Sequence, residues 1–120
     1  MKALHVLVVE DDAIIGILLV EMLSGMGHDC TFEATEADAI ASAGRSRPDL
    51  MIVDARLGEG SGITAVEQIL QAGHVPHVFV SGDTLRIKAL MPGAEVVQKP
   101  FRESDLTRAM HRVLGTAALS

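Results

Sequence analysis

The stretch ALHVLVVEDD, residues 3–12, decides the fold. It joins a mostly aliphatic run, 3–9, to an acidic run, Glu10-Asp11-Asp12. A continuous aliphatic run is typical of a strand that is buried on both faces, as in a parallel sheet covered by helices. The next segment has apolar residues at helical spacing, namely Ile15, Leu18, Leu19, Met22 and Leu23. The stretch therefore predicts a strand that leads into a helix, with carboxylates at the junction.

The same unit recurs along the chain. Short aliphatic runs predict strands at 3–9, 29–34, 50–53, 77–81 and 95–98. Segments with helical spacing lie between them, and Thr35-Glu36-Ala37-Asp38 resembles a capping box at the start of the second. The fourth helix, near 84–91, has room for only about two turns. Five βα repeats predict an α/β fold, a doubly wound five-stranded parallel sheet with helices on both faces.

Length, charge and cysteine content bound the possible functions. The chain has 120 residues, so we expect one domain spanning 1–120. The net charge is −6 and the chain has no basic run, which argues against direct nucleic-acid binding. Cys30 is the only cysteine, which excludes an internal disulfide and favours a reducing cytoplasmic location. The longest apolar run, 13–20, is too short to span a membrane.

Polar side chains follow the central strands at the point where each strand ends. Glu10-Asp11, Asp54, Ser81-Gly82 and Lys99-Pro100 all occupy such positions. Because parallel strands end at one edge of the sheet, these residues are expected to meet there. Clustered carboxylates repel one another unless a cation joins them, and Mg²⁺ prefers oxygen ligands. A carboxylate beside the metal can form an acyl phosphate, with a lysine and a hydroxyl holding the transferred oxygens.

In order and spacing, Glu10-Asp11, Asp54, Ser81 and Lys99-Pro100-Phe101 resemble the motif set of response-regulator receiver domains of two-component systems. The resemblance covers essentially the whole chain. It implies a flavodoxin-like fold with strand order 2-1-3-4-5. It also implies a signalling phosphoacceptor that assists its own phosphorylation and dephosphorylation, rather than an enzyme.

The resemblance assigns a role to each of these residues. Asp54 matches the phosphoacceptor, and Mg²⁺ would be held by Glu10, Asp11, Asp54 and the backbone carbonyl of Arg56. Ser81 and Lys99 match the hydroxyl and the lysine that contact the phosphoryl group. The bond from Lys99 to Pro100 is expected to be cis. The donor would be a histidine kinase or a histidine phosphotransfer protein, and the output would be binding to a downstream protein.

The sequence departs from the family at three places. Gly58 stands where receivers commonly carry proline, which suggests a more mobile loop. Val96 replaces the usual Tyr or Phe three residues before the lysine, so we expect output without that aromatic switch, or with Phe79 or Phe101 in its place. The short fourth helix puts family-type dimerisation in doubt.

Two further sets of residues are candidates for specific roles. Arg56, Gly82 and Asp83 flank the expected phosphoryl group, and an Arg56–Asp83 pair would shield it from water. Ile14 and Ile17 lie outside the apolar stripe of the first helix. In the family this edge docks on the donor's helical bundle, so both are predicted partner contacts, with peripheral core packing as the alternative.

Three alternatives remain open from the sequence. Phosphohydrolases with a strand-end aspartate nucleophile need a second aspartate two residues later, where this chain has Arg56, which cannot donate a proton at ordinary pH. A pseudo-receiver would act by binding alone, although the full acidic set argues against it. The initial Met1 and the short tail favour a stand-alone protein without an output domain, and excision from a longer protein is the alternative.

Overall fold

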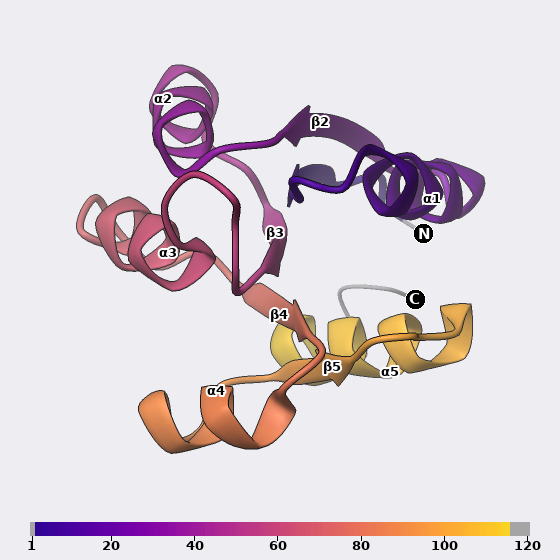
Figure 1. The fold of residues 1–120 in the computed structure, drawn as a ribbon. Helices are drawn as coiled ribbons and strands as arrows, with labels where there is room; N and C mark the ends of the chain where they lie inside the picture. Colours follow the sequence, from indigo (N-terminus) through magenta and orange to yellow (C-terminus); the bar gives the residue numbers. More distant parts are fainter. Residues whose placement is uncertain (1, 116–120) are drawn as a thin grey trace.

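The computed structural model describes residues 2–115, so Met1 and the last five residues of the predicted domain lie outside the described part. Strands and helices alternate throughout, as the sequence predicts (Figure 1). The elements are β1 (His5–Val9), α1 (Ala13–Gly25), β2 (Asp29–Glu33), α2 (Glu36–Arg45), β3 (Leu50–Asp54), α3 (Gly62–Leu70), β4 (His77–Ser81), α4 (Thr84–Leu90), β5 (Val96–Gln98) and α5 (Glu103–Leu114). The expected shortness of α4 is confirmed, since it has 7 residues.

The five strands form one parallel sheet in the order β2-β1-β3-β4-β5. This order confirms the predicted doubly wound topology. The chain leaves β1 toward β2 on one side and then returns to β3 on the other. The carboxyl ends of β1 and β3 therefore flank the switch point, where sheets of this type bind their ligands.

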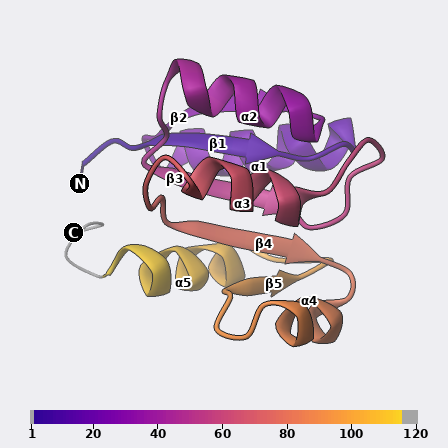
Figure 2. The same ribbon diagram turned by 90° about the vertical axis from the view of Figure 1, so that its left-hand side faces the viewer.

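Helices cover both faces of the sheet because the strands are apolar on both sides. Val6 and Val8 face a core shared with α1 and α5, whereas Leu7 and Val9 face a core shared with α2 and α3. α4 completes the second layer through Ile87. Figure 2 shows this second side, with α2, α3 and α4 in front of the strands.

Side-chain caps fix where the first two helices begin. Asp12 accepts hydrogen bonds from the backbone N–H groups of Ile14 at 2.9 Å and Ile15 at 3.2 Å. Thr35 accepts one from the N–H of Asp38 at 3.1 Å. Such caps satisfy backbone donors that have no partner within the helix. Asp12 is thereby assigned to the start of α1, and its two acidic neighbours remain for the site.

Candidate functional site

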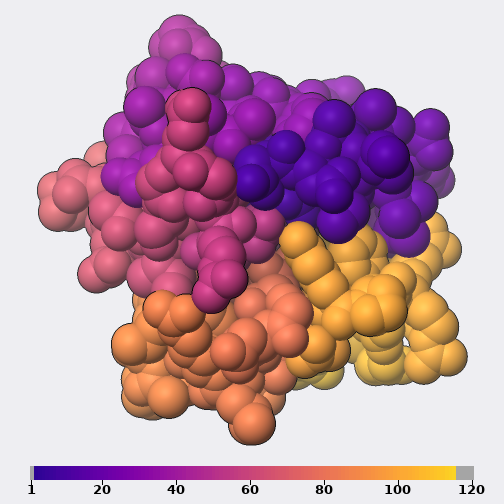
Figure 3. Space-filling model, viewed as in Figure 1, coloured from indigo at the N-terminus to yellow at the C-terminus, as the bar shows by residue number. Residues whose placement is uncertain are grey.

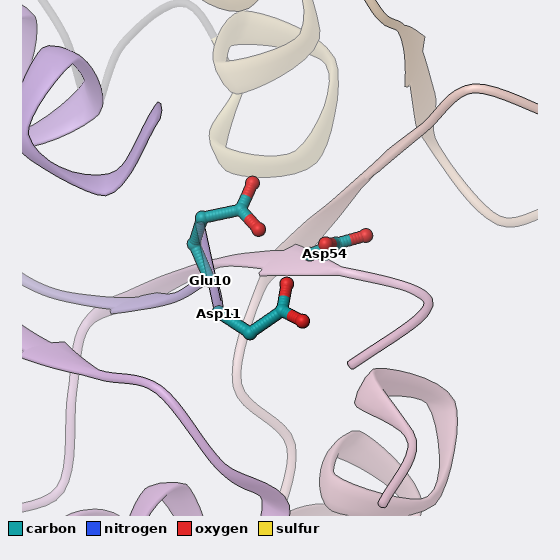
Figure 4. Close-up of side chains that lie close together, drawn as sticks. All are labelled: Glu10, Asp11 and Asp54. Carbon is teal, nitrogen blue, oxygen red and sulfur yellow. The ribbon is translucent and has the colours of Figure 1, made fainter. Parts of the chain in front are cut away.

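The acidic residues predicted to meet do so at the carboxyl edge of the sheet. Glu10 and Asp11 follow β1, and Asp54 is the last residue of β3. Each offers a carboxylate oxygen within 4.8 Å of the others. Figure 4 shows the three side chains projecting into the same space from two neighbouring segments. Glu10 and Asp54 are buried, whereas Asp11 is exposed to solvent.

Lys99 joins two of these carboxylates. Its Nζ donates to Glu10 Oε1 at 2.9 Å and to Asp54 Oδ2 at 3.2 Å. The lysine directly follows β5, and the Lys99–Pro100 peptide bond is cis, which confirms that expectation. The predicted site lysine therefore lies against the predicted phosphoacceptor.

Burial and charge shift the acid–base behaviour of this cluster. Burial, followed by the interaction with Asp54, raises the pKa of Glu10 to about 7. Burial also disfavours the Lys99 ammonium, but its hydrogen bond to Glu10 and the charges of Asp54 and Glu10 outweigh burial and raise its pKa. A single lysine thus compensates only part of the negative charge gathered here.

The donor set fits Mg²⁺. Three carboxylates offer converging oxygens, and oxygen is the ligand type that Mg²⁺ takes. Burial and then the neighbouring Asp54 carboxylate disfavour the Glu10 anion and raise its pKa, and a bound cation would favour that anion. Glu10, Asp11 and Asp54 are therefore the residues that would hold the ion, and the Arg56 carbonyl stays a predicted fourth ligand.

The loop after β3 is tied to the site by its backbone. Asp54 Oδ1 accepts from the N–H of Arg56 at 3.1 Å, and Asp11 Oδ2 accepts from the N–H of Gly58 at 2.7 Å. A proline at position 58 would have no N–H to donate. The departure from the family at this position therefore adds a contact to a predicted metal ligand.

Gly62 has a steric reason to be glycine. A Cβ at this position would lie 1.9 Å from the backbone carbonyl oxygen of Asp54. The start of α3 can therefore approach the end of β3 only without a side chain at 62. This close approach closes the loop that carries Arg56 and Gly58.

A cavity of about 640 Å³ opens beside Asp54. Its lining includes Ser81 and Lys99, and it extends between α3 and α4 to Ile63, Ile87 and Leu90. In the space-filling view of this side, the loop after β3 lies between the start of α1 and α4 (Figure 3). The cavity is larger than a phosphoryl group alone requires, and its far wall belongs to α4.

The expected tuning residues Arg56, Gly82 and Asp83 all border this cavity, and the last two also form hydrogen bonds of their own. Asp83 Oδ1 caps α4 by accepting from the N–H of Arg86 at 3.1 Å, and the Asp83 N–H donates to Ser81 Oγ at 3.0 Å. The Gly82 carbonyl accepts from Gln98 Nε2 at 3.0 Å. Within residues 2–115 no ion pair joins Arg56 to Asp83.

Comparison with known proteins decides the family. A family model of the response regulator receiver domain matches residues 6–111. The chain belongs to this family. The match covers β1 from its second residue onward, the other four strands completely, and all the site residues described above.

Sequence and structure relatives agree with this assignment. The receiver domain is 31% identical over 118 residues to the phyllosphere-induced regulator PhyR of Methylorubrum extorquens, covering 93% of this chain and 44% of that protein. The solution structure of the Erythrobacter litoralis PhyR receiver domain superposes with a TM-score of 0.88 at 31% identity, covering 97% of this chain and 93% of the other. The chain thus spans less than half the length of the Methylorubrum regulator.

A second similar structure holds a metal. It is the receiver domain of a sensor histidine kinase from Pseudomonas aeruginosa, with a magnesium ion coordinated in its active-site cleft. It superposes with a TM-score of 0.85 at 27% identity, covering 96% of this chain and all of the other. Its described metal binding agrees with the donor set found in the present receiver domain.

The structure excludes core packing as the role of Ile14 and Ile17 on α1 of this receiver domain. Ile14 is 80% exposed and Ile17 is 55% exposed, so neither belongs to the core. Their role as partner contacts stays a prediction. Within residues 2–115 no helix combines the length and the apolar character needed to cross a membrane.

Val96 of β5, which stands where the family usually has an aromatic residue, lies beside an aromatic residue of β4. Val96 pairs in register with Phe79 of β4, and the two lie in the same core beneath α4. Phe79 is fully buried, whereas Phe101 packs partly buried against the opposite core. Only Phe79 of the two candidate rings therefore lies on the side of Val96.

Sequence reasoning missed Arg86, which lines the cavity beside Asp54 from α4. The only indication in the sequence was that Arg86 lies in the first turn of the short helix that follows Ser81. Lone arginines on short helices are usually solvated, so that signal by itself indicates nothing.

Proposed function

We propose that this receiver domain accepts a phosphoryl group on Asp54 from a phosphohistidine, in a reaction that depends on Mg²⁺. The observation that supports this most is the meeting of Asp54 with Glu10, Asp11 and Lys99 at one point of the sheet edge. The domain would act as a phosphoacceptor that assists its own modification, and not as an enzyme with a separate substrate.

The described side chains suit this transfer. A carboxylate oxygen of Asp54 forms a bond to phosphorus, the P–N bond to the donor breaks, and the imidazole leaves with the electron pair. The imidazole is neutral on departure when its other nitrogen carries a proton. Lys99 is placed to pair with the transferred oxygens, and Ser81 can donate its hydroxyl hydrogen to one of them because Oγ only accepts from Asp83.

Mg²⁺, when bound by Glu10, Asp11 and Asp54, would neutralise charge that develops on the phosphoryl oxygens. Lys99 and the N–H of Arg56 hold the two oxygens of Asp54 separately, at Oδ2 and Oδ1. This fixes the carboxylate before a donor arrives. Such preorganisation lowers the cost of reaching the reactive geometry.

The partners are proposed from the exposed surface and from the family. The donor would be a histidine kinase or a histidine phosphotransfer protein that docks on α1 through Ile14 and Ile17. The output would be a conformational change read by a downstream protein, because the domain has no basic run suited to nucleic acid. We propose the cytoplasm as its location, where such donors and a reduced Cys30 would be found.

Intact-mass measurement tests the central step. The protein is incubated with Mg²⁺ and acetyl phosphate beside an Asp54→Asn variant. We expect the mass of one phosphoryl group to be gained by the wild type, and to be absent without Mg²⁺ and in the variant. If wild-type protein with intact fold gains no mass, a phosphorylated histidine donor is tried next, and failure with both leaves the binding-only reading.

A further inference from the structure

Two arginines that have no side-chain partner within the described residues line the cavity beside Asp54. Six of the ten lysines and arginines are held by carboxylates or by a backbone carbonyl. Within residues 2–115 the remaining four have no such side-chain partner, and they are Lys2, Arg56, Arg86 and Lys88. Of these, only Arg56 and Arg86 line the cavity that holds the phosphoacceptor.

The backbone of Arg86 is coupled to Ser81 by two hydrogen bonds. Asp83 Oδ1 accepts from the Arg86 N–H, and the Asp83 N–H donates to Ser81 Oγ. The first turn of α4 is thereby positioned on the hydroxyl that is expected to contact the phosphoryl group. The Arg86 side chain is exposed and free of other bonds in the described chain, so it can move without breaking a contact.

Charge gives this free guanidinium a role once Asp54 is modified. A phosphoryl group carries about −1.5 to −2 charge and three strong acceptor oxygens. Lys99 already serves two carboxylates, so it cannot match the added charge alone. Arginine binds phosphate oxygens in a fork of parallel hydrogen bonds, which makes it the suited partner for such a group.

We propose that Arg86 binds the phosphoryl oxygens on Asp54 and draws the first turn of α4 over the cavity. The proposal rests on the phosphoacceptor function described above. It assigns to α4 a direct ionic contact with the phosphoryl group, in a chain whose β5 has Val96 in place of an aromatic ring. α4 would then report phosphorylation through its own arginine.

The test uses beryllofluoride, a phosphoryl mimic, in the presence of Mg²⁺. Its affinity for the full chain is measured by calorimetry and by ¹⁹F NMR for wild type, Arg86→Ala, Arg86→Lys and Lys88→Ala. Lys88 is the matched control, because it is an unpartnered cation on the same helix that does not line the cavity. Amide hydrogen exchange of α4 is recorded with and without the mimic.

We expect Arg86→Ala to weaken binding of the mimic about tenfold, as for loss of one charge-assisted contact. Arg86→Lys should retain part of the affinity, and Lys88→Ala should retain nearly all of it. The mimic should slow amide exchange in α4 of wild type and Lys88→Ala but not of Arg86→Ala. A purely structural role of Arg86 would leave affinity for the mimic unchanged once the fold is intact.

Two results would overturn the proposal while leaving the phosphoacceptor function in place. One is equal affinity of Arg86→Ala and wild type for the mimic. The other is an equal loss in Arg86→Ala and Lys88→Ala, which would indicate a general effect of charge. If wild type binds no mimic and takes no phosphoryl group from any donor, the phosphoacceptor function fails, and the role of Arg86 fails with it.

Discussion

Glu10 and Lys99 are 89 residues apart in sequence, and their side chains are 2.9 Å apart in space. The first follows β1 and the second follows β5, and β3 and β4 lie between these strands in the sheet. Lys99 therefore reaches across the carboxyl edge and contacts Asp54 on the way. Because Lys99 contacts both carboxylates, protonation of Glu10 changes the charge balance around Asp54.

The metal-free protein should lose stability as the pH rises through neutrality. The folded pKa of Glu10 is about 7, above its ordinary value of 4.5, because burial favours the neutral acid. A raised pKa contributes stability that is fully present below about 4.5 and is lost as the pH rises through about 7. Urea unfolding in the presence of a chelator, between pH 5 and 8, measures this loss.

Glu10→Gln is the control for that experiment, because it keeps the shape of the side chain and removes the titration. The free energy of unfolding of this variant should depend less on pH over the same range. An unchanged pH dependence in Glu10→Gln would show that other groups cause it.

Binding of Mg²⁺ should depend on the backbone of Gly58. Gly58→Pro removes the N–H that donates to Asp11 Oδ2, whereas Gly58→Ala keeps it but places a Cβ 3.0 Å from the same oxygen, so each variant is compared with wild type. Loss of a group that orients a metal ligand commonly weakens binding tenfold or more, so we expect about a tenfold loss for Gly58→Pro. Calorimetric titration with Mg²⁺ compares the two variants with wild type. Equal affinities of Gly58→Pro and wild type would mean that the hydrogen bond does not orient Asp11.

The sequence alone predicts the strands and the sheet edge where the site lies, whereas the strand order follows from the resemblance to receiver domains. Aliphatic runs and acidic junctions locate each strand within a residue or two, and parallel strands must end at the same edge. The differences are small: β1 begins at His5 rather than at residue 3, and β5 begins at Val96 rather than at residue 95. Hydrogen bonding at the sheet ends sets these limits, and composition does not encode it.

The sequence does not predict the contacts that depend on the conformation of the loops. The Gly58 N–H donates to Asp11 because the loop after β3 folds back toward β1. Nothing in the sequence of residues 55–61 specifies this loop conformation. Likewise the Asp83 carboxylate caps the start of α4, a local bond that the sequence does not specify, and its pairing with Arg56 across a phosphoryl group stays a prediction. Short acidic side chains at the start of a helix commonly cap its free backbone N–H groups.

Replacement of Ile17 by glutamate should slow phosphotransfer from a protein donor. Ile17 is exposed on α1, so the change leaves the core intact, but it places a charge on the proposed docking surface. We expect at least a tenfold lower rate from a phosphorylated histidine protein and an unchanged rate from acetyl phosphate.

Leu85→Glu provides the matched control for docking, because Leu85 is 81% exposed on α4, away from α1. It should leave transfer from the protein donor unchanged. Equal slowing by Ile17→Glu with both donors would place its effect in the chemistry or the fold, and not in docking.

The contact between α1 and β2 should depend on Gly16 and Phe32 together. A Cβ at position 16 would lie 2.2 Å from the tip of the Phe32 ring, so Gly16→Ala forces the ring away from α1. In wild type we expect a net loss of about 1 kcal/mol, because lost packing outweighs the better helix propensity of alanine. In a Phe32→Ala background the same change should stabilise by about 0.5–1 kcal/mol. A double-mutant cycle from urea unfolding gives the coupling, and additivity would show that the ring moves aside without cost.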